Sequence, residues 1–523
     1  MRYLLAAINA KYIHSNLGIY SLRRYAMERL GLGQKDEQGA AVGMEMVSEA
    51  AEGANRTKTV SKIQIDLGEY TINHQMDQIL QDIYRRKPDV VGFSCYIWNI
   101  VYVKDLIHDL KKVLPQVRIW MGGPEASYDA VHLMDELPEV ELIMQGEGEE
   151  TFTRLVEACE CGTEVCFSDL PGIVLRRSDG TIEVHRPAPL MNLDDIPFSY
   201  GDLSGLEHRI IYYESSRGCP FSCSYCLSSI DKKVRFRSLS LVTRELQFFL
   251  DRKVPQVKFV DRTFNCKKSH SMAIWQYLLE HDNGITNFHF EISSDLLDDD
   301  ELALMKQMRP GLIQLEIGVQ TTNPVVVKEI RRTMDLDKVA RRVAQVNTFG
   351  NIHQHLDLIA GLPYEDYDSF RRSFADVYAL RPQQLQLGFL KVLRGSFMYE
   401  HTEEYDCHYQ EREPYEVLYT KWLPYDDVLK LKDVEEMVEV YYNSGQFVHT
   451  LPMIERLYEN PFDFFQELGD FYRAKGYSEA AHNRIQRYEI LLGFLQDEKQ
   501  QDEAFFRQMM MLDLYARENM KTR

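Results

Sequence analysis

Three of the nine cysteines stand close together in residues 214–229, which read ESSRGCPFSCSYCLSS. They are Cys219, Cys223 and Cys226, in the spacing C-x-x-x-C-x-x-C. Cysteine thiolates bind iron–sulfur clusters or zinc. A four-iron cluster ordinarily takes four cysteine ligands, so three would hold the cluster and leave one iron open, as a catalytic zinc site keeps an open position. The spacing therefore predicts a reactive metal centre in this loop.

A structural zinc site is the alternative, with His208 or His270 as the fourth ligand. Zinc ribbons usually pair two C-x-x-C knuckles. The chain has no second such pair, and the C-x-C formed by Cys159 and Cys161 belongs to a different predicted domain. The spacing therefore favours the cluster over zinc.

The cysteine loop follows a predicted strand, RIIYYESS, and further strand segments come after it, each next to a predicted helix. These segments are VPQVKFVDRTF, NFHFEISSD, GLIQLEIGVQ, NIHQHLDLIAGLP and PQQLQLGFLKVL. This strand–helix alternation over residues 206–396 predicts a partial (β/α)6 barrel of the TIM-like kind, with its active face at the carboxyl ends of the strands. The cysteines would lie at that face.

Residues 1–160 alternate short apolar strands with amphipathic helices, beginning with RYLLAAIN and LGIYSLRRYAMERLG. This alternation predicts an α/β domain with a doubly wound parallel sheet. A stretch rich in Gly, Ala and Glu at about 31–58 predicts a surface insertion. Residues 161–205 predict a hairpin around Asp179 and Gly180, followed by a linker.

Small and polar residues follow several predicted strands of this first domain. They are Ser94, Gly122, Gly123, Gly146 and Glu147. Glycines after strands permit the close approach of a large ligand at the carboxyl edge of a parallel sheet. These positions are therefore candidates for a binding edge.

Residues 397–523 read as helices, with apolar residues at i, i+3 and i+4, and no strand is predicted there. We expect a packed helical domain.

The composition is that of a globular protein, with 45% hydrophobic and 27% charged residues. A formal net charge of −20 argues against a broad nucleic-acid footprint, which needs an excess of Lys and Arg. No apolar run is long enough to span a bilayer, and the apolar run at the start is too short for a signal sequence. We therefore expect a cytoplasmic protein without a membrane partner, in a compartment that keeps thiols reduced.

The segment RGCPFSCSYC resembles the signature loop of the radical S-adenosylmethionine (SAM) superfamily, C-x-x-x-C-x-aromatic-C, with Tyr225 as the aromatic residue. The resemblance implies a four-iron–four-sulfur cluster held by the three cysteines, whose remaining iron chelates SAM. Electron transfer into the sulfonium would then give a 5′-deoxyadenosyl radical. The cofactor carries that chemistry, and the protein supplies orientation and excludes water.

The resemblance continues along the later strands, in VKFVDRTFN, FHFEISSD, LEIGVQTTNPVVVKEIRR and DLIAGLPYE. For each carboxylate there, a surface or helix-capping role is the alternative. The resemblance places eight residues around SAM: Tyr225, Asp261, Arg262, Glu291, Glu316, Gln320, Arg332 and Asp357.

Residues 1–396 together resemble the cobalamin-binding branch of the radical SAM enzymes. The resemblance implies cobalamin between the edge of the first sheet and the mouth of the barrel, beside the edge positions named above. Members that ligate cobalt through histidine carry D-x-H-x-x-G after the first strand, whereas this chain has NAKYIHSNLG, without the Asp. His14 is thus a candidate ligand, and a lower cobalt face without a ligand, or covered by another side chain, is the alternative. The last segment resembles an uncharacterised helical tail of one subgroup.

The expected activity is cobalamin-dependent methyl transfer to an unactivated carbon or phosphorus centre. A radical rearrangement, cyclisation or C–S bond formation without methyl transfer is the second hypothesis, and a cobalamin or redox sensor without enzyme activity is the third. The expected partners are an electron donor such as flavodoxin or ferredoxin and a small-molecule or peptide substrate.

Overall fold

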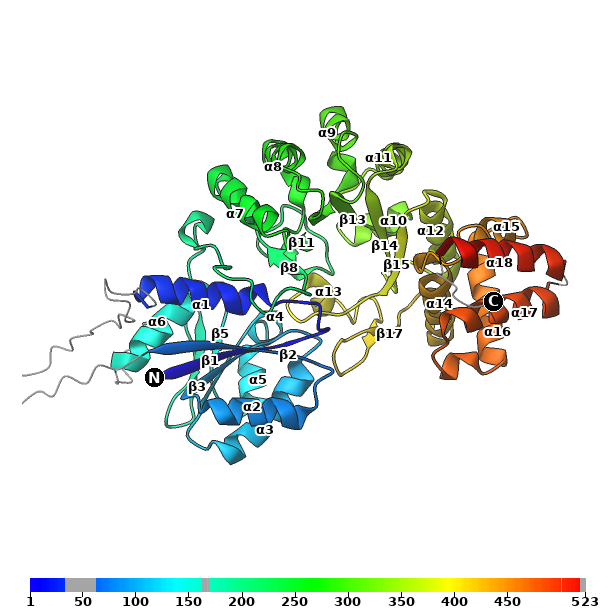
Figure 1. Cartoon of the computed structure of the whole chain (residues 1–523). Helices are drawn as coiled ribbons and strands as arrows, with labels where there is room; N and C mark the ends of the chain where they lie inside the picture. Colours follow the sequence, from blue (N-terminus) through cyan, green and yellow to red (C-terminus); the bar gives the residue numbers. More distant parts are fainter. Residues whose placement is uncertain (33–62, 162–166, 168, 500, 518–523) are drawn as a thin grey trace, which may run out of the picture.

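The computed structural model describes residues 1–32, 63–161, 167, 169–499 and 501–517. The described chain forms two α/β regions followed by a helical region (Figure 1). The insertion predicted at about 31–58 falls almost entirely outside the described residues.

The first region contains a sheet in the order β2-β1-β3-β4-β5-β6-β7. Strands β1 to β5 pair in parallel, and β6 and β7 add antiparallel edge strands. The predicted hairpin around Asp179 and Gly180 is therefore present and belongs to this sheet. The strands are β1 (Arg2–Asn9), β2 (Gln64–Thr71), β3 (Val90–Ser94), β4 (Arg118–Gly122), β5 (Val140–Met144), β6 (Ile173–Arg176) and β7 (Ile182–Val184).

Helices cover both faces of this sheet because its central strands are apolar on both sides. In β1, Leu4, Ala6 and Ile8 pack in one buried layer, with residues of α2, α3 and α5. The alternate residues Tyr3 and Leu5 pack in the other layer, with residues of α1 and α6. The helices are α1 (Leu17–Arg29), α2 (Met76–Arg86), α3 (Ile100–Val113), α4 (Pro124–Ser127), α5 (Ala130–Glu136) and α6 (Gly148–Cys161).

The second region contains a parallel sheet in the order β15-β14-β13-β12-β11-β8, so the predicted strands are confirmed. Its strands are β8 (Ile211–Tyr213), β11 (Gln256–Phe259), β12 (Asn287–Ile292), β13 (Ile313–Gln320), β14 (His353–Ala360) and β15 (Gln384–Phe389). The cysteine loop contributes a separate short pair, β9 (Ser216–Arg217) and β10 (Arg235–Phe236).

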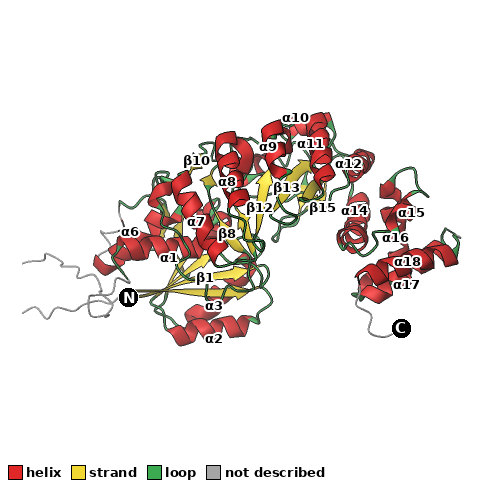
Figure 2. Ribbon diagram, turned by 45° about the horizontal axis from the view of Figure 1, so that its top comes forward, coloured by secondary structure: helices red, strands yellow, loops and turns green. Residues whose placement is uncertain are grey.

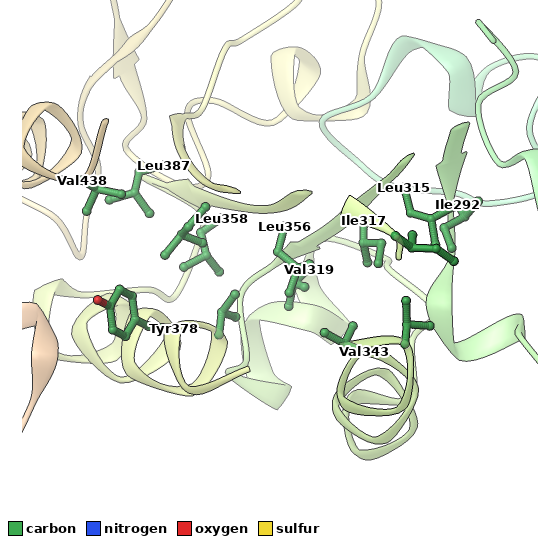
Figure 3. Close-up of a cluster of buried hydrophobic side chains, with 14 of the residues drawn as sticks. Ile292, Leu315, Ile317, Val319, Val343, Leu356, Leu358, Tyr378, Leu387 and Val438 are labelled. Carbon is green, nitrogen blue, oxygen red and sulfur yellow. The ribbon is translucent and has the colours of Figure 1, made fainter. Parts of the chain in front are cut away.

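Helices lie in a row along one side of this sheet (Figure 2). They are α7 (Leu239–Asp251), α8 (Lys268–Glu280), α9 (Asp299–Met305), α10 (Pro324–Glu329), α11 (Leu336–Phe349) and α12 (Tyr367–Ala379). Figure 3 shows Leu315 and Leu356 of the sheet on the side of Val343 and Tyr378, from α11 and α12. Because side chains alternate along a strand, the residues between these core positions point to the opposite face, which we call the inner face.

The last region is helical, as predicted, except for one short antiparallel strand pair, β16 (His408–Tyr409) and β17 (Val417–Tyr419). Such a short pair carries no periodicity that a sequence reading could detect. The helices are α13 (Phe397–Glu400), α14 (Tyr425–Met437), α15 (Leu451–Glu455), α16 (Pro461–Ala474), α17 (Arg484–Asp497) and α18 (Glu503–Arg517). A π-helical turn, Val438–Asn443, continues α14.

The helical region packs on the far end of the second sheet, beside α12 (Figure 1). Arg371 of α12 makes a two-point ion pair with Asp463 of α16, at 2.6 Å for both nitrogen–oxygen pairs. Tyr367 of α12 also donates to Gln466 of α16 at 2.5 Å. One hydrophobic core runs through both regions, so they share a single packed body.

Candidate functional site

The cysteine loop leaves the carboxyl end of β8 and is held by the backbone on two sides. Cys219 and Cys223 are buried and Cys226 is half-buried, and all three thiols are free. The N–H of Cys219 donates to the carbonyl of Asp231 at 3.0 Å, and the N–H of Ser224 donates to the carbonyl of Ile330 at 2.9 Å. The thiols are therefore carried by an ordered loop.

Gly218 makes the entry to this loop possible. Its φ is +99°, and a Cβ there would lie 2.7 Å from the carbonyl oxygen of Lys233. Any other residue would meet both a strained backbone and a clash with main chain. The glycine before the first cysteine thus lets the two arms of the loop approach each other.

Arg332 joins the end of β13 to the cysteine loop. Its Nη1 lies 3.7 Å from Sγ of Cys223 and 3.2 Å from the hydroxyl of Tyr225, and its Nη2 donates to the carbonyl of Gly318. Burial alone lowers the pKa of Arg332, but Tyr225 and Cys223 outweigh it and raise the pKa. A fixed positive charge therefore stands beside the second cysteine.

Unbonded polar atoms lie beside this guanidinium. Within the described part of the chain, Nε of Arg332 and Oε1 of Gln320 are buried without a hydrogen-bond partner. Gln320 ends β13 with φ at +73°, a conformation uncommon for a residue other than glycine. Buried polar atoms without partners are expensive, so they indicate a place where a polar ligand binds.

The structure places Asp261 and Arg262 on opposite sides of the chain. Asp261 is fully buried and accepts from the N–H of Ser215, the hydroxyl of Ser215 and the hydroxyl of Ser216, at 2.9, 2.5 and 2.8 Å. Burial raises its pKa to about 7. Arg262 is exposed, and its charge acts on Glu291 and on Tyr96 of the first region. Asp261 thus holds the start of the cysteine loop.

The inner face of the second sheet carries an unusual number of charged side chains. Nζ of Lys258 lies 2.8 Å from Oε2 of Glu316 and 3.9 Å from Oε1 of Glu291. Burial raises the pKa of Glu291 to about 7. Burial also favours the neutral form of Glu316, but His289 and Lys258 outweigh it and lower its pKa. Asp357 lies near this group, beside His355.

At the carboxyl edge of the first sheet, His14 reaches across to the second sheet. Its Nδ1 lies 2.7 Å from the hydroxyl of Tyr212 in β8. Its backbone forms an isolated parallel bridge with Ile210. Burial lowers the pKa of His14, so the ring is neutral near pH 7. The predicted histidine therefore lies at the junction of the two sheets.

The other residues predicted at this edge fall into two groups: some lie at the strand ends of the first sheet, and Glu147 contacts the second region. Ser94, Gly122 and Gly123 end β3 and β4, and a Cβ on Gly123 would lie 2.6 Å from the carbonyl oxygen of Cys95. Glu147 forms an ion pair with Arg235, at 2.5 Å, which ties the first region to the cysteine loop. Gly146, with φ at +77°, has open space where a Cβ would be.

Sequence reasoning missed Tyr212, Lys258, His289 and His355 as site residues. The signal was present in the alternation of the strands, since NFHFEI and HQHLDLIA place histidines and carboxylates on one face and apolar residues on the other. The hydrogen bond that Tyr415 donates to Glu125 was also missed, because the two residues are 290 positions apart in the chain.

Comparison with known families gives a match for each region. Residues 3–156 match the B12 binding domain, residues 213–377 match the radical SAM superfamily, and residues 403–523 match a family described as a protein of unknown function, DUF4080. The chain thus carries a B12-binding domain, a radical SAM domain and a DUF4080 domain, in that order.

Among curated relatives, the cobalamin-dependent radical SAM methyltransferase TokK of Streptomyces tokunonensis is 27% identical over 305 residues, which cover 54% of this chain and 44% of TokK. The hopanoid C-3 methylase of Methylococcus capsulatus is 24% identical over 57% of this chain and 56% of its own length. The matches thus span about half the length of these relatives.

Two solved structures share the fold over most of the chain. TsrM from Kitasatospora setae, a radical SAM methyltransferase solved with cobalamin and a [4Fe-4S] cluster, gives a TM-score of 0.60 at 14% identity, over 77% of this chain and 75% of its own. The cobalamin-dependent radical SAM enzyme OxsB, solved with aqua-cobalamin, gives 0.57 at 14% identity, over 99% and 81%. Within the described residues, no helix is both long and apolar enough to cross a bilayer.

Proposed function

We propose that this chain is a cobalamin-dependent radical SAM methyltransferase, acting on an unactivated centre of a small-molecule or peptide substrate. One observation carries the proposal. Three free thiols lie in an ordered loop at the carboxyl end of β8, against Arg332 and next to the edge of a B12-binding domain. The similarity to the methyltransferase TokK and to the hopanoid C-3 methylase supports the proposal.

The donor set fits a four-iron cluster. Cys219, Cys223 and Cys226 supply three thiolates, and the open iron would take SAM. When bound, the cluster supplies the electron that cleaves SAM to the 5′-deoxyadenosyl radical, and cobalamin carries the methyl group. The protein's part is to exclude water and to fix orientation.

We assign the SAM pocket to side chains around the unbonded atoms of Gln320 and Arg332. Tyr225 closes the pocket from the cysteine loop, and we propose that the exposed Arg262, which follows β11, reaches the bound SAM. Asp261 acts as a positioning residue, because its carboxylate accepts hydrogen bonds from Ser215 and Ser216. The remaining predicted carboxylates are Glu291, Glu316 and Asp357, which we place on the inner face below this pocket rather than in contact with SAM.

We place cobalamin at the carboxyl edge of the first sheet, beside Ser94, Gly122, Gly123 and Gly146, of which Gly146 has open space where a side chain would be. His14 is held by Tyr212 with a neutral ring, which suits a cobalt ligand. The alternative remains a cobalt face without a protein ligand. Cobalt content and the visible spectrum of the His14→Ala variant separate the two, because only loss of a ligand shifts the spectrum of bound cobalamin.

We further propose that the second sheet is the open six-stranded barrel of a radical SAM domain, with domain boundaries at 1–160, 161–205, 206–396 and 397–523. The helices on one side and the polar inner face on the other support this arrangement. An external reductant, such as flavodoxin or ferredoxin, would deliver the electron. We expect a cytoplasmic protein.

The test uses the full chain, reconstituted without oxygen and given SAM and dithionite. It should release 5′-deoxyadenosine, and Cys223→Ala should abolish the release while Cys266→Ala, a cysteine outside the loop, should retain it. Cobalamin copurifying with the protein, and methyl-labelled product from labelled SAM, would separate methyl transfer from a rearrangement. An absence of 5′-deoxyadenosine from the cluster-loaded wild type would overturn the proposal.

A further inference from the structure

Three potential metal ligands gather on the inner face of the second sheet, with a further histidine beside them. His289 comes from β12, Glu316 from β13, and His355 and Asp357 from β14. The register pairs Glu316 directly with His355, and Gly318 with Asp357, so the side chains come from neighbouring strands at alternate positions. One ligand atom each of Glu316, His355 and Asp357 lies within 4.8 Å of the others.

These atoms are close to one another but do not hydrogen-bond. Nε2 of His355 lies 3.0 Å from Oδ1 of Asp357, and Nε2 of His289 lies 2.9 Å from Oε2 of Glu316. Nevertheless, among the described residues, both Nε2 atoms and Oδ1 of Asp357 have no hydrogen-bond partner and are shielded from solvent. The rings themselves are only 9% and 7% exposed. Ligands of one metal ion lie close to one another without hydrogen-bond geometry, because each ligand directs its lone pair at the ion.

The charges of the group also leave a place for a cation. Glu291, Glu316 and Asp357 face one another across the inner face, and Lys258 contacts Glu291 and Glu316. Arg262 is exposed and acts on Glu291 from the strand end. Three carboxyl groups thus face the basic side chains of Lys258 and Arg262 and the imidazoles of His289 and His355. Buried negative charge is retained when a cation compensates it.

We propose that Glu316, His355 and Asp357 form a binding site for one divalent transition-metal ion, with His289 beside it and separate from the cysteine loop. One imidazole nitrogen and two carboxylate oxygens suit Zn²⁺ or Fe²⁺ better than Mg²⁺ or Ca²⁺, which prefer oxygen ligands alone. Ligands at about 2.1 Å from one ion lie about 3.0–3.4 Å apart. His355 and Asp357 have this spacing at 3.0 Å, and the ligand atom of Glu316 lies within 4.8 Å of both.

Outer contacts hold the ligands as metal sites require. Lys258 contacts Oε2 of Glu316 at 2.8 Å, which orients that carboxylate. The side-chain amide of Gln314 lies 2.9 Å from Nδ1 of His289. Because the amide nitrogen of Gln314 donates to Nδ1, the ring proton of His289 lies on Nε2, on the side of Glu316.

The site lies apart from the thiols along the strand. Glu316 precedes Gln320 by four positions, which is roughly 13 Å at about 3.3 Å per residue, whereas Gln320 and Arg332 stand at the strand end with the cysteines. The ion would therefore occupy the inner face below the SAM pocket. There it could anchor an anionic or carbonyl group of the substrate, so that cluster and ion serve different ligands.

The experiment uses the full-length chain, loaded with its cluster so that the cysteines are occupied. The protein is dialysed without oxygen against Zn²⁺, then against metal-free buffer, and both zinc and iron are measured. The wild type should retain about one zinc per chain, and His355→Gln and Asp357→Asn should each bind zinc at least about ten-fold more weakly. Iron content should not change in either variant.

His353→Gln is the matched control, because this histidine lies on the same strand two positions earlier and is exposed. It should retain zinc like the wild type. Zinc absent from the dialysed wild type would overturn the proposal, whatever the variants do. Zinc retained equally by both ligand variants would also overturn it, because the ion would then be bound elsewhere. Since iron is read separately, failure here would leave the cluster assignment intact.

Discussion

Nη1 of Arg332 lies 3.7 Å from Sγ of Cys223, although the two residues are 109 positions apart in the chain. The same guanidinium contacts Tyr225 and the carbonyl of Gly318. One side chain therefore connects the cysteine loop to the end of β13, the strand that ends in the unbonded amide oxygen of Gln320. The cysteine loop and the proposed SAM pocket are therefore linked directly through Arg332.

Arg332→Gln should weaken SAM binding more than cluster binding. The glutamine removes the positive charge beside Cys223 and leaves Tyr225 without its partner, but all three thiols remain. We expect iron content near the wild-type value and an affinity for SAM lower by roughly ten-fold, as loss of a charge-assisted contact costs about 1.5–3 kcal/mol. Equilibrium binding of SAM to the reconstituted protein measures this. Arg341→Gln, on the exposed surface of α11, is the control.

Asp261→Asn should loosen the cysteine loop without touching a ligand. The carboxylate accepts three hydrogen bonds from Ser215 and Ser216, and an amide would present an N–H to one of these donors. We expect a loss of about 1–3 kcal/mol in stability and faster loss of iron to a chelator. Asp105→Asn, on the exposed side of α3, should change neither. Equal rates of iron loss in the wild type and Asp261→Asn would refute the positioning role.

Gly361→Ala tests the contact between the radical SAM domain and the DUF4080 domain. The φ of Gly361 is +88°, and its Cβ would lie 2.7 Å from Cγ1 of Val417 in β17. We expect a cost of about 1–3 kcal/mol, from backbone strain and overlap together. In a double-mutant cycle, Val417→Ala should recover about 1 kcal/mol of this, because it removes the overlap and leaves the strain. Strict additivity would show that the two residues are not in contact.

Glu365→Gln should change the pH dependence of stability. Burial raises the pKa of Glu365 to about 7, although Thr321 and Ser373 donate to its carboxylate. Between pH 4.5 and 7 the folded protein therefore holds a proton that the unfolded chain has lost, so stability falls as pH rises through this window.

Glutamine cannot ionise, so the variant should gain stability relative to the wild type by up to about 3 kcal/mol at pH 8 and little at pH 5. Urea unfolding at the two pH values measures the difference. Glu280→Gln, on the exposed end of α8, is the control. A difference that is the same at both pH values would show that Glu365 is ionised in the folded protein throughout.

The main elements of this fold could be predicted because their patterns are local. The cysteine spacing, the apolar runs of β1 and β13 and the helical periodicity of the last region all lie within short windows of sequence. Family matches then agree with the three regions.

What escaped prediction depends on contacts between distant segments. Asp261 and Arg262 lie in the turn after β11, where no strand alternation applies, and only the packed structure shows that Asp261 is buried and Arg262 exposed. The histidines of the inner face, His289 and His355, meet Glu316 through strand register, which the sequence alone does not fix. The edge pairing of β6 with β5 and the contact of Tyr415 with Glu125 are likewise tertiary.

The most direct test of the central claim is the iron and acid-labile sulfide content of the full chain purified without oxygen, compared with Cys223→Ala and Cys266→Ala. A cluster held by Cys219, Cys223 and Cys226 predicts about four iron and four sulfide per wild-type chain, retained in Cys266→Ala and lost in Cys223→Ala. Wild-type protein without sulfide, holding instead a zinc ion that disappears in Cys223→Ala, would contradict it.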